Sequence, residues 1–154
     1  MYKKILVPLD GSELAERALK HLESIYKRDA KNSVILLRVV EPLLVEARDL
    51  VEADRESELK SKQEEEAKRY MEKVKIQLKN KGMSVKNIIE FGMDPAYKIL
   101  EVAKKENVDL IVMCTHGKSK FLHWMFGSVA NRVLMHTPIS VLVVVPEERA
   151  GKYL

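Results

Sequence analysis

Ser33–Val40 reads SVILLRVV, an almost unbroken run of apolar and often β-branched residues. A strand with one face in water alternates apolar and polar residues, whereas Arg38 is the single charge in this run. The pattern therefore predicts a strand buried on both faces, as in a parallel sheet that helices cover on both sides.

Four further strand candidates surround this run, and helical patterns separate them. The predicted strands are Tyr2–Leu9, Ser33–Val40, Val85–Phe91, Val108–Cys114 and Ile139–Val145. The predicted helices are Glu13–Arg28, 55–81, a segment starting at Asp94-Pro95, and Ser128–His136. Residues 41–54 stay ambiguous. Strict alternation predicts an α/β domain over 1–154 with a single open five-stranded parallel sheet and helices on both faces, Rossmann-like in type.

The helix ends carry recognisable signals. Asp10 or Ser12 can cap the first helix by accepting hydrogen bonds from its free N–H groups. Asp94 followed by proline is a typical start for the third helix. Gly82 stands where a glycine often ends a helix, just after the long charged one.

The composition excludes several classes of protein. The chain has 154 residues, 46% hydrophobic and 32% charged, and its apolar residues fall into regular blocks, which argues against disorder. No apolar run approaches the ~18 residues of a membrane span. The start, MYKKILVPLDGSE, does not resemble a secretory leader. Cys114 is the only cysteine and can form no internal disulfide, so we expect a cytoplasmic protein.

The formal net charge of +4 is unevenly distributed. Residues 41–81 hold 11 acids and 10 bases, which nearly cancel and predict a solvated helix face. Residues 110–146 hold no acid and three bases, namely Lys118, Lys120 and Arg132. This acid-free stretch favours a small anionic ligand, and nucleic acid is an unlikely partner because the long helix is charge-balanced.

Ligands of parallel sheets bind beyond the carboxyl ends of the strands. Asp10 follows the first strand and can serve as a helix cap, a contact to a sugar hydroxyl or a metal ligand. After the fourth strand come Gly117 and Gly127-Ser128. Glycine lets the backbone approach a ligand, and the N–H groups at a helix start favour an anion, so these positions predict a phosphate cradle.

Two other motifs fail. Gly117-Lys118-Ser119 resembles the end of a P-loop, but the first glycine of that motif would fall on Val112, inside a strand. The histidines are not accompanied by the second acid or the cysteine pair that a metal site would need. No His–Asp pair is visible that would activate Cys114 as a nucleophile. We therefore assign no catalytic residue.

Three segments, KKILVPLDGSE, ILLRVVEP and GSVANRVLMHTPISVLVVV, resemble the universal stress protein family, whose fold is adenine-nucleotide α-hydrolase-like. The resemblance covers nearly the whole chain. Nucleotide-binding members carry G-x2-G-x9-G-[ST] after the fourth strand; Gly117, Gly127 and Ser128 match it, whereas Cys114 replaces the first glycine. The resemblance implies an ATP-binding stress protein that acts as a nucleotide-linked switch or scaffold and is at most a weak ATPase.

Carried over by position, the resemblance also implies a site. Asp10 and Pro8 would lie by the ribose and phosphates, Val39 would present its backbone to the adenine, and Met113 and Cys114 would line the nucleoside. The phosphates would meet His116, Gly117, Lys118, Lys120, Gly127, Ser128 and Val129. A divalent cation, Mg²⁺ or Mn²⁺, would bridge the phosphates and Asp10.

Cys114 leaves an alternative function open. If its side chain blocks the pocket, the protein would be a dimeric interaction module that binds no nucleotide, and its crevice would be filled or collapsed. If glycine were needed for a positive φ, cysteine would cost ~1–3 kcal/mol of strain. If glycine were needed for a close approach to the ribose, the cost would be steric, and in a strand-like conformation cysteine would be harmless.

Ile139–Val145 predicts a homodimer, because an exposed apolar edge strand is an aggregation hazard that pairing with a second copy removes. The family resemblance implies the same dimer, together with a protein partner of unknown identity. The competing expectation is that Glu147–Leu154 folds back over the edge.

Overall fold

The computed structural model describes residues 2–26, 32–43, 50–115 and 127–145. Strands and helices alternate along the chain, as the pattern of apolar runs predicts. The strands are β1 (Lys4–Pro8), β2 (Ser33–Val40), β3 (Val85–Phe91), β4 (Leu110–Cys114) and β5 (Ser140–Val144). The helices are α1 (Glu13–Ile25), α2 (Leu50–Asn80), α3 (Pro95–Lys105) and α4 (Ser128–His136).

The five strands form one parallel sheet in the order β3-β2-β1-β4-β5, which confirms the predicted fold class. β1 lies in the centre, so the chain builds one half of the sheet, then crosses β1 to build the other. The order of the strands reverses at β1 and β4, and a crevice forms beyond their carboxyl ends.

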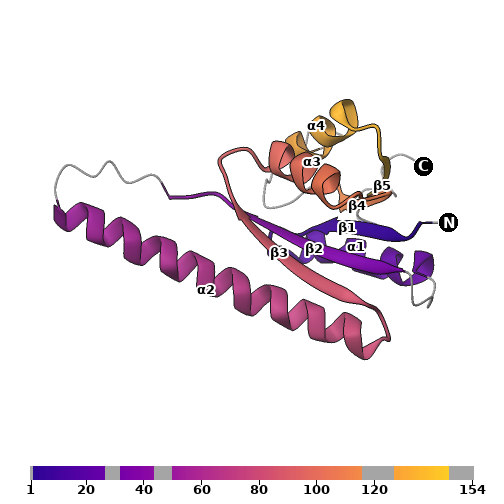
Figure 1. The fold of residues 1–154 in the computed structure, drawn as a ribbon, viewed down its shortest axis with the longest axis horizontal. Helices are drawn as coiled ribbons and strands as arrows, with labels where there is room; N and C mark the ends of the chain where they lie inside the picture. Colours follow the sequence, from indigo (N-terminus) through magenta and orange to yellow (C-terminus); the bar gives the residue numbers. More distant parts are fainter. Residues whose placement is uncertain (1, 27–31, 44–49, 116–126, 146–154) are drawn as a thin grey trace.

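Helices cover both faces of the sheet (Figure 1). Within β1, Ile5 and Val7 face the layer of α1 and α2, while Leu6 faces α3 and α4. The first layer is anchored by the buried residues Leu19, Leu22, Met71, Val74 and Leu78, and the second by Ile99, Val102, Ala130 and Val133. Because both faces are covered, every residue of β4 is buried and no residue of β2 is exposed, which explains their continuous apolar sequences.

The predicted caps are confirmed. The Ala15 N–H donates to Ser12 Oγ (3.1 Å), and the Tyr97 N–H donates to Asp94 Oδ1 (3.1 Å), so Ser12 caps α1 and Asp94 caps α3. Gly82 has φ +82°, the left-handed conformation that ends helices. Its N–H donates to Lys79 O (2.8 Å), which completes the turn after α2.

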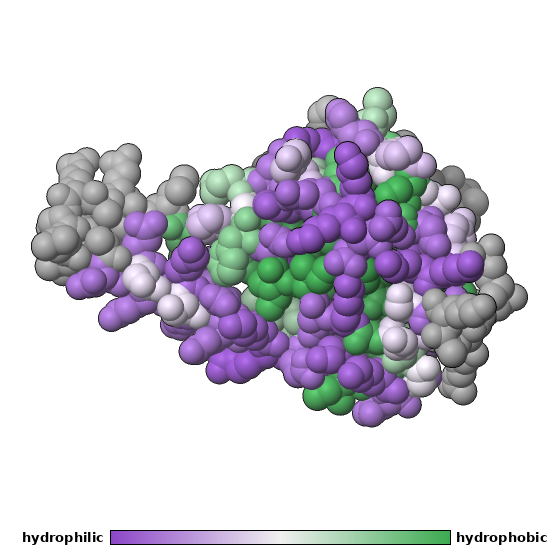
Figure 2. All heavy atoms as spheres, viewed as in Figure 1, coloured by the Kyte–Doolittle hydropathy of each residue, from purple (hydrophilic) through white to green (hydrophobic). Residues whose placement is uncertain are grey.

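Helix α2 begins at Leu50, earlier than the position 55 that the sequence predicts. Its C-terminal half packs on β2 and β3 through Met71, Val74 and Leu78, whereas its N-terminal half extends past the end of the sheet (Figure 1). Figure 2 shows the resulting hydrophilic surface along this helix. Between residues 54 and 66 this helix has no buried side chain. Among the described residues, no helix is long and apolar enough to cross a membrane.

Candidate functional site

A cavity of about 470 Å³ opens at the carboxyl ends of β1, β2 and β4. Its volume falls in the range of roughly 300–1,000 Å³ that small-molecule sites occupy. The structure brings together eight of the residues that the sequence predicts for the site: Pro8, Asp10, Val39, Met113, Cys114, Gly127, Ser128 and Val129. The four others, His116, Gly117, Lys118 and Lys120, lie outside the described residues.

The turn from β1 to α1 places Asp10 at the cavity. The Ser12 N–H donates to Asp10 Oδ1 (2.9 Å), and the Ser12 hydroxyl donates to the same oxygen (2.5 Å). Gly11 makes the turn with φ +82°, a backbone conformation that residues other than glycine rarely adopt. Ser12 rather than Asp10 therefore caps the helix, and Asp10 lines the crevice.

Cys114 ends β4, and its backbone is not strained. Among the described residues, the only one other than glycine with positive φ is Asn107, so Cys114 is strand-like and the predicted strain cost does not arise. The side chain belongs to the core cluster beneath α1, together with Ala15 and Ala18. Burial raises the pKa of its thiol. Cys114 therefore borders the cavity without filling it.

The N-terminus of α4 forms another wall of the cavity. The Gly127 N–H donates to Thr115 O (2.5 Å), and Gly127 O accepts from the Asn131 N–H (2.9 Å), which joins the start of the helix to the end of β4. Gly127 has no side chain that could cap the helix. The first N–H groups of a helix have no partner within it, and the helix dipole adds positive potential there.

Four polar residues that sequence reasoning missed also line the cavity: Arg38, Glu41, Gln63 and Thr115. Arg38 could have been found, because it is the one charge in the β2 run and stands next to Val39. Gln63 could not, because it comes from α2, whose position over the sheet depends on the packing of the whole molecule.

The Arg38 guanidinium lies beneath the β1–α1 turn. Its Nη1 donates to Leu9 O (3.3 Å), and a side-chain Cβ at Gly11 would lie 3.5 Å from the same nitrogen. Burial lowers the pKa of Arg38, while the nearby Asp10 carboxylate opposes that change. The site therefore contains a half-buried cation next to its aspartate.

A second cavity of about 300 Å³ lies between α2 and this turn. It shares Asp10, Arg38, Val40 and Gln63 with the first and adds Glu66 and Tyr70. Burial raises the pKa of the Tyr70 hydroxyl, with Glu16 acting in the same direction. The two cavities thus meet at Asp10 and Arg38.

The predicted divalent cation fits the residues around Asp10 poorly. Within the described ranges, no group of three or more His, Cys, Asp or Glu side chains could hold a metal ion. Asp10 already accepts two hydrogen bonds from Ser12, and the Arg38 guanidinium stands beside it. A second cation at Asp10 would meet that positive charge.

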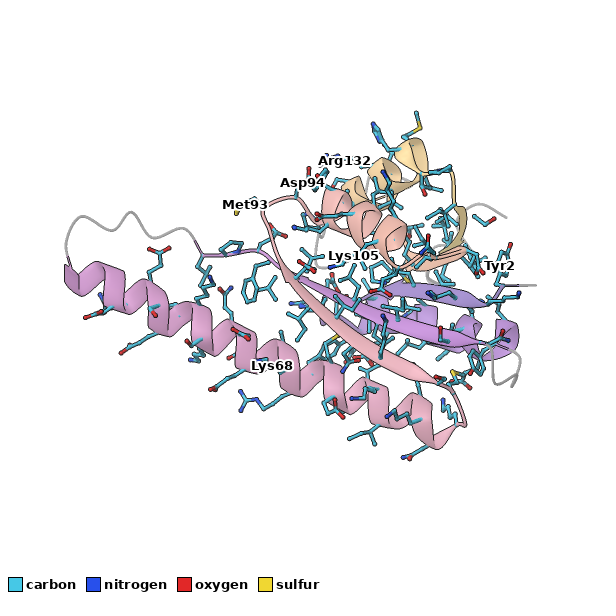
Figure 3. All side chains as sticks on the ribbon, in the orientation of Figure 1. Tyr2, Lys68, Met93, Asp94, Lys105 and Arg132 are labelled. Atoms are coloured by element: carbon cyan, nitrogen blue, oxygen red, sulfur yellow. The ribbon has the colours of Figure 1, made fainter. Side chains whose placement is uncertain are left out.

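Arg132, one of the three bases in the acid-free stretch, is engaged elsewhere. Its Nη1 and Nη2 donate to Asp94 Oδ1 (2.9 Å) and Oδ2 (2.7 Å), which ties α4 to the cap of α3. Figure 3 shows the pair on the outer side of these two helices. Arg132 is therefore a structural ion-pair partner. Of the three bases, Lys118 and Lys120 are still predicted to bind an anionic ligand.

Comparison with known proteins gives one consistent match. The family model described as the universal stress protein family matches residues 1–145. The universal stress protein MJ0577 from Methanocaldococcus jannaschii is 40% identical, covering 94% of this chain and 95% of that protein. A solved structure of MJ0577 superposes with a TM-score of 0.84 at 41% identity, covering 96% of this chain and 98% of that one.

Two more distant solved structures share the fold and contain adenine nucleotides. One is a universal stress protein in complex with cAMP, with a TM-score of 0.65 and 20% identity over 94% of this chain and 97% of that one. The other, from Arabidopsis thaliana, has AMP bound, with a TM-score of 0.66 and 16% identity over 96% of this chain and 98% of that one.

Proposed function

The chain belongs to the universal stress protein family, and from this membership and the geometry of its crevice we propose that it binds ATP and acts as a nucleotide-linked switch or scaffold in the stress response. The observation that carries the proposal is the convergence of Asp10, Val39 and the start of α4 on one cavity of about 470 Å³. Such a crevice offers a carboxylate for a sugar, apolar walls for a base and a helix N-terminus for phosphates.

In this proposal each wall of the cavity meets one part of the nucleotide. Asp10 and Pro8 lie by the ribose and phosphates, and Val39 presents its backbone to the adenine. Met113 and Cys114 line the nucleoside, and Gly127 begins the helix that faces the phosphates. Ser128 and Val129 add their backbone N–H groups to the phosphate side. His116, Gly117, Lys118 and Lys120 complete that side by prediction from the sequence.

We propose at most a weak ATPase activity, and we assign no catalytic residue. A helix N-terminus binds and polarises phosphates, but hydrolysis also needs a positioned base. The alternative, an interaction module whose pocket Cys114 blocks, lacks its distinguishing sign, because the cavity is open and the Cys114 side chain belongs to the core beneath α1.

The proposal includes a cytoplasmic homodimer of single-domain chains that joins through β5, with a protein partner of unknown identity. Among the described residues β5 pairs only with β4, and Val141–Val143 are only partly buried. Any Mg²⁺ or Mn²⁺ would arrive with the phosphates, since the described residues supply no set of metal ligands.

Calorimetry with ATP and Mg²⁺ tests the proposal, supported by mass spectrometry of nucleotide released from the purified protein. Gly127 has φ −63° and ψ 153°, which any residue can adopt, so Gly127→Val adds bulk at the cavity without left-handed strain. We expect the wild type to bind ATP and Gly127→Val to bind at least tenfold more weakly, about 1.4 kcal/mol.

Gly92→Val is the matched control, because an added Cβ there would meet only the flexible Lys98 side chain among its nearest atoms and Gly92 does not line the cavity. The control should bind ATP like the wild type. No heat from the wild type up to millimolar nucleotide, with no co-purified nucleotide, would overturn the proposal.

A further inference from the structure

We propose that Gln63 of α2 is a specificity-determining residue, which recognises the N6–N7 edge of a purine base and so favours a 6-amino purine over a 6-oxo purine. The inference rests on the proposed function, because it assigns a side chain to base selection in the same crevice. Gln63 belongs to a helix and not to the loops beyond the strand ends, so the motifs of the sequence do not point to it.

Gln63 lies on the face of α2 that turns toward the sheet. Ala67 and Tyr70 follow it at helical spacing, four and seven residues further on, and all three line the second cavity. Gln63 also lines the first cavity, together with residues 39–41 where β2 ends. In the proposed function the backbone of Val39 meets the adenine, so Gln63 belongs to the wall beside the base.

Two contacts hold this part of α2 at the cavity. Gln63 Nε2 donates to Glu41 O (3.2 Å), just beyond the end of β2. One helical turn earlier, Lys60 Nζ lies 5.5 Å from the centroid of the Phe91 ring at the end of β3, which is a cation–π contact. Because α2 contacts the ends of two neighbouring strands, the Gln63 side chain is positioned before a ligand binds.

The hydrogen bond to Glu41 also fixes the orientation of the Gln63 amide. A backbone carbonyl only accepts hydrogen bonds, so the amide must present its NH₂ group, and not its oxygen, to Glu41 O. Turning the amide over would bring two oxygens together and break the bond. With one N–H used, the amide keeps a second N–H donor and its Oε1 acceptor, and among the described residues no further hydrogen bond engages them.

This remaining donor and acceptor match adenine. Along its N6–N7 edge adenine offers an amino donor and a nitrogen acceptor, and a glutamine amide can pair with both. A 6-oxo purine presents two acceptors on that edge, O6 and N7, so Gln63 Oε1 would face another oxygen. The amide cannot turn over to relieve this contact without losing its bond to Glu41 O.

Calorimetric titrations with ATP, 7-deaza-ATP and ITP test the inference. 7-Deaza-ATP has a C–H group in place of N7 and keeps the N1–N6 edge, so it probes only the edge assigned to Gln63, whereas ITP has an oxygen in place of the amino group. We expect the wild type to bind 7-deaza-ATP about three- to tenfold more weakly than ATP, the effect of one neutral hydrogen bond. ITP should bind at least about tenfold more weakly than ATP.

Gln63→Met keeps the length and helix propensity of the side chain without the amide. We expect this variant to bind ATP and 7-deaza-ATP within about twofold of each other, and its preference for ATP over ITP to fall at least about threefold. Gln77→Met is the matched control, because Gln77 is exposed on the same helix and lines neither cavity, and it should keep the wild-type ratios. Each ratio compares two nucleotides on one protein, so a general loss of affinity or stability does not imitate the effect.

The outcomes separate this inference from the proposed function. If the wild type binds none of the three nucleotides, the proposed function fails. If the wild type binds ATP and 7-deaza-ATP equally, prefers ITP, or passes its ratios unchanged to Gln63→Met, only the role of Gln63 is refuted. The wild-type comparison needs no substitution, and Gln63→Leu, for which the same ratios are expected, replaces Gln63→Met if that variant does not fold.

Discussion

Cys114 shows how one residue can border a site and still belong to the core. It ends β4, where successive side chains point to opposite faces of the sheet. Its thiol joins the cluster beneath α1, while Met113 belongs to the cluster on the other face, beneath α3 and α4. The glycine that the family motif has at this position is therefore not required by the backbone conformation, because Cys114 has an ordinary strand φ.

Cys114→Gly tests this conclusion. We expect a loss of about 1–2 kcal/mol in the free energy of unfolding, because glycine weakens a strand and leaves buried space. The affinity for ATP should stay within about threefold of the wild-type value, because the thiol contributes less than about 1 kcal/mol to nucleotide binding. Urea denaturation and calorimetry measure the two effects, with Cys114→Ala as the control for the lost thiol. A tenfold gain in affinity for the glycine variant would show that the thiol obstructs the pocket.

The cavity residues divide by how directly the sequence encodes them. Asp10 and Gly127-Ser128 could be placed because the carboxyl ends of parallel strands meet at one edge of the sheet, where ligands bind. Pro8, Val39 and Met113 could be placed only through the family resemblance. Arg38 is marked in the sequence as the one charge in the β2 run, next to Val39, but the pattern of a buried strand does not say what its side chain contacts. Gln63 reaches the cavity only through the packing of α2, which no local pattern reveals.

At the scale of elements, the start of α3 is coupled to the middle of α4. Asp94 caps α3 through the Tyr97 N–H and also pairs with both terminal nitrogens of Arg132 on α4. Ala130 and Val133 then pack in one core cluster with Ile99. The ion pair and the apolar contacts together set where α4 begins, and its first turn forms the cavity wall.

Replacing Asp94 separates its two roles. Asparagine can still cap a helix, so Asp94→Asn loses only the ion pair, whereas Asp94→Ala loses both and should lower Tm by roughly 2–4 °C. The Arg132 guanidinium, followed by the Tyr97 N–H, holds the pKa of Asp94 below its ordinary value. The ion pair therefore stabilises the fold above the ordinary carboxyl pKa and is lost as pH falls through the lowered pKa of Asp94.

Thermal melts from neutral pH down to about pH 2 measure this dependence. The Tm difference between the wild type and Asp94→Asn should be full at neutral pH and vanish at the acid end. Glu101→Gln is the control, because Glu101 pairs with Lys98 on the same helix without reaching α4. A difference that persists unchanged at the acid end would mean that the ion pair does not carry the effect.

Helix α2 shows the limit of pattern reading at this scale. Ala67, Met71, Val74 and Leu78 repeat at helical spacing and are buried, and the last three belong to the core cluster beneath the sheet, so this part of the helix is predictable. Residues 54–66 include no buried position, so this part of the helix lacks a clear apolar period. The sequence therefore predicts a start at 55, whereas the helix begins at Leu50.

Among the described residues, the sheet ends in two edge strands of different character, β3 and β5. The segment Glu147–Leu154, which the competing expectation places over the β5 edge, lies outside the described residues. β3 carries Lys86 and Glu90 and is flanked by α2, whereas β5 carries no charge and its residues Val141–Val143 are partly exposed. Charges on an edge strand oppose pairing with another chain, and their absence favours it. The proposed dimer interface therefore falls on the β5 side.

Val143→Lys tests the dimer. Val143 is partly exposed on β5 and belongs to neither core cluster, so a charge there should disturb an interface more than the fold. We expect sedimentation velocity to show a shift from dimer to monomer at micromolar concentration, with Tm lowered by only a few degrees. Met135→Lys is the control, since Met135 is 73% exposed on α4 and not on the edge strand. A wild type that sediments as a monomer would contradict the interface.

The central position of β1 also has a consequence for synthesis on the ribosome. Because β1 pairs with β2 on one side and with β4 on the other, its second edge has no partner until Leu110 has left the ribosome exit tunnel. The half-sheet of β1, β2 and β3 can assemble first, with α1 and α2 covering only one of its faces. A nascent chain that has not yet released Leu110 would therefore expose an apolar face and an unpaired strand edge. We expect chaperones to bind such a chain.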